Sequence, residues 1–589
     1  MTVYKFRQCF LDTGERCVVR GGSHLEMTLK AFDVLQLLVE RAGEIVTKEE
    51  ILDKVWSGSF VEEGNLPVHV SKLRRTLGES NGERFIETVP GTGYRFTAPV
   101  ETVSSEVWRK QLSGNGRRRT DKSPTKLAFD SIAVLPMRNE SDDPEIDYLV
   151  DGLTESFINS LSRLPDIKVI ARDTVFRYKN KGVDPKEVGE TLGVATVLSG
   201  RIKVIKNRLM ISVELINVED LSQIWGTQFN QPFSDIINIQ EEITLAVSEK
   251  LRSEIGDVVR ASLNNPVTQH PESYRVYLKG KYFEDKHTES DLYKAIEYFQ
   301  QSVSFDPANI HSYVGAVECY RLLYVFDHIS YKDALTKINP ILEVLSKLNQ
   351  SIDVLQVVYG ELKFQLYWEF EAAENHIRRA LAINPKCVIA HFRYSELLVL
   401  SGRFSEALEE LQTIMQIDPL SPLTYKLIGR IFVATGQYEN AIVYFRDAHE
   451  MEPTDYEALT LMGGALAELG RYSDALDAFK KAISFSYNAD IFSLIGYVYA
   501  LDGRTSEALK IIGRLKSESE GDRHKNAIKL ARIYVALGEN NTAYKYLDKA
   551  FNRHEVDLVA LSFDARFARI RHERRFKDLA MRVGLPVSS

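Results

Sequence analysis

The sequence predicts a multidomain protein with a small α+β module, a central α/β domain and an all-α superhelix, in that order. Three observations carry this prediction. A short basic helix followed by a two-stranded hairpin occurs within the first hundred residues. Buried-type strands then alternate with amphipathic helices, as in α/β domains. In the carboxyl-terminal half, alanines recur about every 34 residues, the length of one helix pair in a repeat array.

The chain opens with strand-like segments at residues 3–10, 15–19 and 24–27, which are separated by glycine-containing turn signals. A helix is predicted over residues 29–40, because Phe, Leu and Val recur there at helical spacing. Gly43 follows as a helix-ending residue. This order predicts an antiparallel sheet that leads into a helical core.

A capping box opens the next helix. Thr47 can accept a hydrogen bond from the amide of Glu50, and the Glu50 side chain can reach back to the start of the helix. The residues that follow supply apolar core, namely Ile51, Leu52, Val55 and Trp56.

A third helix, predicted over residues 65–78, is amphipathic and has a basic outer face. Its apolar residues recur at intervals of three and four and form one inward stripe, made of Leu66, Val70, Leu73 and Leu77. At roughly 100° per residue, the outward residues are Asn65, Val68, Ser71, Lys72 and Arg75, flanked by His69 and Arg74. Such a helix fits the major groove of duplex DNA, where Lys or Arg donates to guanine and Asn pairs with adenine.

A predicted hairpin, residues 84–97, follows this helix. Strands at 84–89 and 94–96 flank Pro90-Gly91-Thr92-Gly93, a turn whose glycines can supply φ > 0. Helix and hairpin together predict the DNA-contacting set Asn65, His69, Ser71, Lys72, Arg74, Arg75, Thr92, Tyr94 and Arg95. A lone basic helix is more often a solvated surface, but here the helix order and the turn chemistry agree on DNA. Asn65 and His69 could each still be ordinary surface groups.

These segments resemble the OmpR/PhoB-type winged helix-turn-helix family. The resemblance rests on LKAFDVLQLLVERAGEIVTKEEILDKVW, LPVHVSKLRRTLGE and FIETVPGTGYRF, and it covers residues 1–100. It implies a DNA-binding domain with base readout by Lys72 and His69 and phosphate contact by Arg74. It also implies a contact with RNA polymerase through the loop 57–64.

Composition and charge separate this module from the rest of the chain. The net charge of the 589 residues is −8, so the acidic remainder must lie away from the duplex, which favours separate domains. The four cysteines form no C-x-x-C arrangement, so we expect no metal, no cofactor and a reducing cytosol. No run reaches the roughly 18 to 20 apolar residues of a membrane span, which predicts a cytoplasmic protein without a membrane contact.

Residues 101–127 are polar and rich in Ser, Gly and basic side chains, and they predict a linker. Residues 128–258 predict an α/β domain. Its strands are expected at 131–136, 168–171, 195–205, 208–217 and 223–228, and its helices at 148–164, 184–192 and 236–255. IAVLPMRN and DGLTESFINSL resemble the TolB amino-terminal-like domain. A phosphoreceiver is disfavoured. Its first strand would end in an acidic pair that binds Mg²⁺, whereas the first strand of this domain ends in Leu135-Pro136-Met137-Arg138.

Residues 270–556 predict a tetratricopeptide repeat (TPR) array of about eight helix pairs. The repeated small residues are Ala295, Ala334, Ala373, Ala407, Ala441, Ala475, Ala508 and Ala543. Glycines five positions earlier would make the turn within a pair, at Gly402, Gly436, Gly470, Gly503 and Gly538. Such arrays form a superhelix with a concave surface for a protein, a peptide or a second copy. Residues 557–589 predict a final amphipathic helix that caps the array.

The order winged helix, α/β domain and TPR array resembles the HilA-like invasion regulators of bacteria. The resemblance implies a cytoplasmic transcription activator that binds double-stranded promoter DNA and meets a protein or self partner through its carboxyl-terminal parts. As a hypothesis of mechanism, two winged helices bind direct repeats as a tandem pair, and a loop or the TPR surface contacts RNA polymerase. The chief alternative is a TPR scaffold or chaperone whose winged helix binds protein. A signalling enzyme acting through the middle domain is disfavoured, because no P-loop, nucleophile elbow or other catalytic motif occurs.

Overall fold

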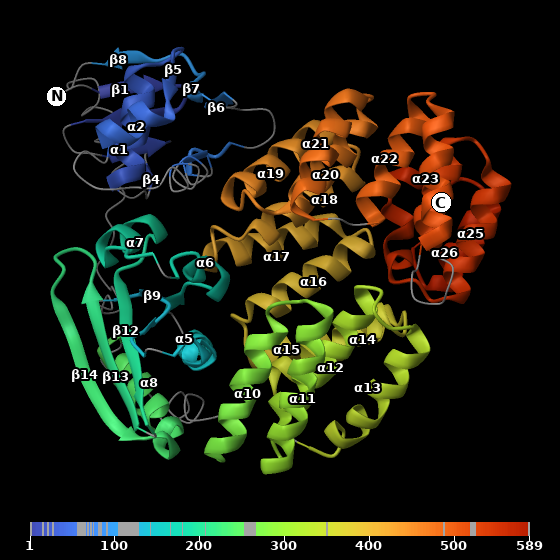
Figure 1. Ribbon diagram of the computed structural model, residues 1–589. Helices are drawn as coiled ribbons and strands as arrows, with labels where there is room; N and C mark the ends of the chain where they lie inside the picture. The colour runs from blue at the N-terminus through green and yellow to red at the C-terminus, as the bar shows by residue number, and fades with distance from the viewer. Residues whose placement is uncertain are drawn as a thin grey trace.

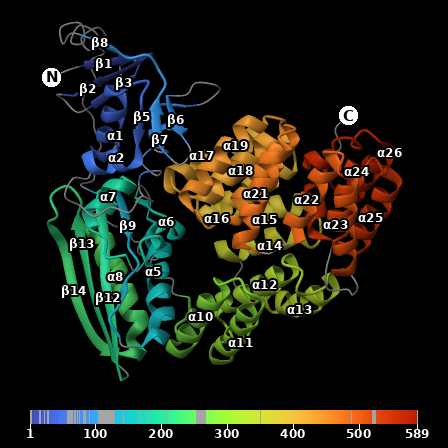
Figure 2. The ribbon, with the colours of Figure 1, turned by 45° about the horizontal axis from the view of Figure 1, so that its top comes forward.

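The computed structural model describes residues 3–13, 17–20, 23–25, 29–55, 66, 70, 73–74, 76–79, 85–89, 92–103, 129–141, 143–164, 167–179, 181–206, 208–251, 267–348, 351–486, 489–518 and 526–586. A winged-helix domain, a domain built on one large sheet and a long array of helices follow one another along the chain. The first two (blue and green) lie on the same side of the array (Figures 1 and 2). The predicted fold class is therefore confirmed.

The amino-terminal sheet is antiparallel, with the strand order β4-β3-β2-β1-β8. Its strands are β1 (Val3–Phe6), β2 (Cys9–Asp12), β3 (Cys17–Arg20), β4 (Ser23–Leu25) and β8 (Glu101–Val103). The single strand predicted at 3–10 is wrong, because the chain turns at Arg7, which adopts a left-handed φ of 49°. Since β8 pairs with β1, this sheet also continues past the predicted limit at residue 100.

The helical core of this domain begins as predicted. Helix α1 spans Leu29–Glu40, and Gly43 after it has a φ of +87°. At the start of α2 (Lys48–Val55), the amide of Glu50 donates to Thr47 Oγ1 at 3.1 Å. The Glu50 carboxylate, however, pairs with Arg41 and Lys54, each at 3.0 Å. Of the predicted capping box, the hydrogen bond from the Glu50 amide to Thr47 is thus present, whereas the Glu50 side chain forms ion pairs and does not reach back to the start of the helix.

The wing is a separate three-stranded sheet with the order β5-β7-β6. Its strands are β5 (Ile45–Thr47), β6 (Ile86–Val89) and β7 (Gly93–Phe96). Gly93 is required by a close approach: an added Cβ would lie 2.0 Å from the Val46 carbonyl oxygen. The prediction that this glycine supplies a left-handed φ is therefore wrong, since it serves the backbone packing of β7 on β5.

The middle domain has a six-stranded sheet with the order β11-β9-β12-β13-β14, and β10 pairs with β12. Its strands are β9 (Ser131–Val134), β10 (Arg138–Asn139), β11 (Lys168–Val169), β12 (Thr196–Ile205), β13 (Arg208–Asn217) and β14 (Gln223–Pro232). Its helices are α5 (Asp147–Ser162), α6 (Arg172–Phe176), α7 (Pro185–Leu192) and α8 (Ile236–Leu251), with the short turns η2 (Pro144–Ile146) and η3 (Phe233–Asp235). The sequence missed α6 and β10 and placed the end of β14 too early.

The array contains eight described helix pairs. They are α10 (Pro271–Glu284) with α11 (Glu289–Phe305), α12 (Ile310–Val325) with α13 (Tyr331–Leu345), α14 (Asp353–Gln365) with α15 (Phe370–Ile383), α16 (Val388–Leu400) with α17 (Phe404–Ile417), α18 (Pro422–Ala434) with α19 (Tyr438–Met451), α20 (Tyr456–Glu468) with α21 (Tyr472–Phe485), α22 (Ala489–Leu501) with α23 (Thr505–Glu518), and α24 (Ala527–Ala536) with α25 (Asn540–Asn552). The predicted repeat architecture is present, whereas the exact limits of the middle domain and of the array stay predictions.

Close approach of the two helices within a pair explains the repeated alanines. All eight predicted alanines have no exposed surface, and the five predicted turn glycines have φ between +73° and +77°. A second signal lies on the first helix of several pairs, where a glycine faces a phenylalanine. A Cβ on Gly463 would lie 2.5 Å from the Phe479 ring, and one on Gly429 would lie 2.4 Å from Phe445. The phenylalanine ring therefore fills the space that the glycine leaves.

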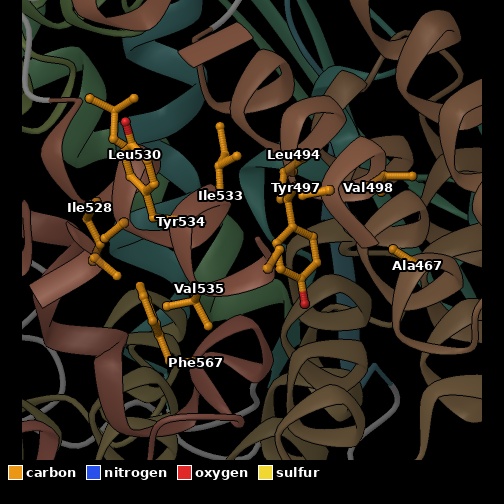
Figure 3. Close-up of a cluster of buried hydrophobic side chains, with 14 of the residues drawn as sticks. Ala467, Leu494, Tyr497, Val498, Ile528, Leu530, Ile533, Tyr534, Val535 and Phe567 are labelled. Atoms are coloured by element: carbon orange, nitrogen blue, oxygen red, sulfur yellow. The ribbon is translucent and has the colours of Figure 1, made fainter. Parts of the chain in front are cut away.

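The carboxyl terminus departs from the predicted single capping helix. It consists of the 3-10 segments η4 (Val556–Phe563) and η5 (Ala565–Phe567) and a ten-residue helix α26 (Arg574–Val583). Phe567 of η5 is fully buried. Figure 3 shows its ring beside apolar side chains of α24, in the same cluster as residues of α22 such as Tyr497 and Val498. The cap therefore extends the hydrophobic core of the last repeats.

Replacing Gly463 with Ala should lower the unfolding midpoint of the array. The new methyl group meets the buried Phe479 ring, and overpacking of this kind costs about 1–3 kcal/mol. Gly464→Ala is the matched control, because nothing lies within 4 Å of its added Cβ. That neighbour should be neutral or gain up to about 1 kcal/mol of helix propensity. Thermal unfolding followed by circular dichroism would compare them, and equal midpoints would contradict the close-approach account.

Candidate nucleic-acid interface

The predicted recognition helix keeps its apolar stripe inside the domain. Leu66, Val70, Leu73 and Leu77 have no exposed surface, and they pack in one cluster with α1 and the wing. Gly78 ends the helix with a φ of +71°. The side chains predicted to face outward at this helix lie outside the described residues, as does the flanking His69; they are Asn65, Val68, Ser71, Lys72 and Arg75.

Arg74 connects the recognition helix to the wing. Its Nε donates to the Ile86 carbonyl oxygen at 3.2 Å, and its Nη2 donates to Thr88 Oγ1 at 2.6 Å. Its Nη1 pairs with Asp447 of α19 at 3.1 Å. The Arg74 side chain is only 13% exposed. In this arrangement its guanidinium is shared between the wing and the repeat array.

Glu79 fixes the end of the same helix to the base of the wing. Its Oε1 accepts hydrogen bonds from the amides of Phe85 at 2.6 Å and Ile86 at 2.7 Å. Burial raises the pKa of the Glu79 carboxyl, against the opposing effect of the Ile86 amide and Arg74. Sequence reasoning missed this residue, because a glutamate after a helix-ending glycine carries no local signal of a buried acceptor.

The three predicted DNA-contacting residues of the wing, Thr92, Tyr94 and Arg95, differ in how exposed they are. Arg95 pairs with Glu87 at 3.4 Å, and both side chains are more than a third exposed. Thr92 lies in the turn, where its carbonyl oxygen accepts from the Lys48 amide at 3.1 Å. Tyr94 has no exposed surface, and its hydroxyl is buried. Burial raises the pKa of Tyr94. Arg95 and Thr92 are therefore at the surface edge of the wing, and Tyr94 is in its core.

The carboxyl-terminal segment, residues 553–586, lies on the repeat array itself. His554 packs edge-on against Trp368, with 3.6 Å between ring centroids, and its Nε2 lies 2.7 Å from the Leu366 carbonyl oxygen. Phe563 of η4 meets Phe404 at 5.3 Å. The segment thereby covers surface of α14 and α16 that the sequence left open for a partner.

Buried ion pairs hold the same segment to α24. Arg532 pairs with Asp564 at 3.0 Å, and the two side chains are 7% and 3% exposed. Burial by itself would raise the pKa of Asp564, but Arg566 and Arg532 outweigh it and lower that pKa to about 2. The carboxylate is therefore charged at neutral pH and is matched by the buried guanidinium of Arg532 and by the partly exposed one of Arg566.

Among the described residues, no helix is both long and apolar enough to cross a membrane. Within the same part of the chain, no group of three or more His, Cys, Asp or Glu side chains could hold a metal ion.

Comparison with protein families agrees with this geometry. Residues 22–96 match the family "Transcriptional regulatory protein, C terminal", and residues 369–431 and 432–496 match the family "Tetratricopeptide repeat". The amino-terminal module is therefore an OmpR/PhoB-type DNA-binding domain, and the protein is a DNA-binding transcription regulator that carries TPR repeats.

Individual relatives cover different parts of the chain. It is 25% identical over 409 residues to "Transcriptional regulator HilA" of Salmonella typhimurium strain LT2, a match that covers 68% of each chain. It is 35% identical over 89 residues to "Phosphate regulon transcriptional regulatory protein PhoB" of Klebsiella pneumoniae, which covers 15% of this chain and 39% of the relative. It is 34% identical over 160 residues to "Putative adenylate cyclase 3" of Rhizobium meliloti strain 1021, 27% of each chain. The similarity to HilA extends well beyond the length of one DNA-binding module.

Removing the Glu79 carboxylate should loosen the wing. In Glu79→Ala, the amides of Phe85 and Ile86 lose their acceptor, and each unsatisfied buried group costs about 1–3 kcal/mol. Glu87→Ala is the control, because its exposed pair with Arg95 is worth less than about 1 kcal/mol. Hydrogen exchange of residues 85–96 would report the difference. Equal protection in the two variants would rule out a structural role for Glu79.

Removing the Asp564 carboxylate should release the carboxyl-terminal segment. Asp564→Asn removes the nearest carboxylate from the buried Arg532, which keeps longer pairs with Asp557 at 3.6 Å and Asp490 at 3.7 Å. The cost should therefore lie below about 3–5 kcal/mol, the cost of a fully broken buried pair. The exposed pair of Asp548 with Arg582 supplies the control Asp548→Asn. Because the pKa of Asp564 is below its usual 3.8, its stabilisation is complete above that pH and is lost as the pH falls toward 2. Unfolding midpoints of both variants across this pH range would test the sign.

Proposed function

We propose that this protein reads specific promoter sequences with its recognition helix, residues 65–78, and its wing, residues 84–97, and that it acts by binding rather than by catalysis. One observation carries the proposal: the buried stripe of Leu66, Val70, Leu73 and Leu77 fixes the rotation of the helix. Helical geometry then turns Lys72 and Arg75 away from the core. The family match of residues 22–96 supports a role in DNA binding.

The proposed contacts divide into two kinds. Lys72 and His69 read base edges in the major groove, where a helix can enter. Arg74, Arg75, Thr92 and Arg95 contact phosphate, which contributes affinity without sequence information. The exposed position of Arg95 at the wing supports the second assignment.

At the promoter, we propose activation by a tandem pair of chains on direct repeats, with the loop 57–64 meeting RNA polymerase. The similarity to "Transcriptional regulator HilA" over 409 residues supports regulation of transcription as the purpose of the whole chain. Action at a bacterial promoter places the protein in the cytoplasm. The repeats supply the surface for a protein partner or a second copy.

A second candidate is a TPR scaffold whose winged helix binds protein. The ion pair between Arg74 and Asp447 favours it, because here the recognition helix does contact a protein surface. The two candidates differ in their affinity for duplex DNA and in its dependence on salt.

Salt dependence provides the test. The full chain is first used to select genomic duplexes, and its affinity for a selected duplex is then measured across salt concentrations. Replacing Lys72 and Arg75 with Ala should reduce the slope of log affinity against log salt by about one unit, because the phosphate neutralised by Arg75 is lost, and it should weaken the preference for the selected duplex, because Lys72 reads base edges. Arg471→Ala, just before α21, with Lys480→Ala on α21 removes two exposed cations and is the control. If no duplex is enriched, or if both pairs change the slope equally, DNA reading by this helix is wrong.

A further inference from the structure

Helix α19 of the repeat array contacts the winged-helix domain where the recognition helix meets the wing. The contact is an ion pair between Arg74 Nη1 and Asp447 Oδ1 at 3.1 Å, with the two side chains 13% and 11% exposed. These residues are 373 positions apart in the sequence. Figures 1 and 2 both show the wing strands β6 and β7 on the side of their domain that faces α19.

A second carboxylate of α19 lies in the same interface. Burial raises the pKa of Glu450, as does the nearby Asp447, while Arg74 and Lys48 oppose that shift. Glu450 and Asp447 also contribute to the raised pKa of Tyr94, whose main cause is burial. The direct contact among these groups is the ion pair of Arg74 with Asp447, which joins the recognition helix to α19.

The spacing of the two acids explains how one helix can face this surface. Residues three positions apart lie on the same face of a helix, so Asp447 and Glu450 present two negative charges together. The group that Asp447 faces, the Arg74 guanidinium, is a cation of the kind that neutralises DNA phosphate. The Arg74 guanidinium already donates to the Ile86 carbonyl oxygen, to Thr88 and to Asp447, so a DNA phosphate would have to take the position of Asp447.

We propose that α19 is an intramolecular cover for the DNA-binding surface, in which Asp447 and Glu450 take the place of backbone phosphates. This inference rests on the proposed function of the winged helix. In the covered state, DNA and α19 compete for Arg74 and for the space beside the wing. The apparent affinity for DNA is therefore reduced by the fraction of chains in which the cover is closed. A partner that draws α19 away would increase promoter binding without touching DNA.

The test compares three forms of the full chain on one duplex. The duplex is selected from genomic fragments with the variant Asp447→Asn/Glu450→Gln, which keeps the shape of both side chains. That variant should bind this duplex at least about ten-fold more tightly than the unchanged chain, because the closed state loses its charge pairing.

The matched control is Asp474→Asn/Asp477→Asn. These two acids have the same spacing on α21, the second helix of the next pair, and they are exposed, with Arg471 and Lys480 as their partners. The control removes the same net charge and should bind within about two-fold of the unchanged chain. Equal tightening in both variants would show a general charge effect and overturn the cover.

Hydrogen exchange gives a second measurement, because a change of net charge alone should not alter the exchange rates of α19. In the unchanged chain, adding the duplex should speed exchange in residues 438–451, and Asp447→Asn/Glu450→Gln should show faster exchange there before DNA is added. Measurable but equal affinities for all three forms overturn the cover and leave the proposed function standing. Failure of all three forms to bind any duplex overturns both.

Discussion

The close approach of two helices within each repeat is the constraint on which the rest of this structure depends. Alanines without exposed surface, such as Ala441 and Ala475, let the helices of a pair approach, and Gly463 receives the ring of Phe479. Small residues at such contacts set the distance and the angle between helices. Repeated along eight pairs, this geometry curves the array, so that α19 lies opposite the recognition helix and the carboxyl-terminal segment returns to α14.

The middle domain is fastened to this array at several separate points. The Lys386 ammonium donates to the carbonyl oxygens of Leu164 and Ile167, each at 2.9 Å. Thr174 donates to the buried Asp418. Because these contacts involve different repeats, the middle domain bridges them and limits their movement relative to each other. The middle domain and the repeat array therefore hold each other in place beside the winged-helix domain. The contact between the winged-helix domain and α19 need not be large.

The sequence predicted what depends on local periodicity and failed where distant segments meet. The stripe through Leu66 and Leu77, helix α1 and the repeat glycines follow from spacing, and each is present. The turn at Arg7 was missed because an arginine with a left-handed φ has no compositional signal. The partner of Arg74 could not be predicted either. Asp447 reads in the sequence as one acid on a polar helix face, and its burial depends on the placement of whole domains.

The return of the carboxyl-terminal segment changes how the repeats can assemble. An open repeat array is held by contacts between neighbours, so folding can begin anywhere and spread. Here Tyr324 donates to the carbonyl oxygen of His554, across 230 positions of sequence. Contacts of such long separation slow folding, because the chain between them must lose its freedom first. A growing polypeptide consequently cannot close this array on the ribosome until His554, which follows α25, has been synthesised.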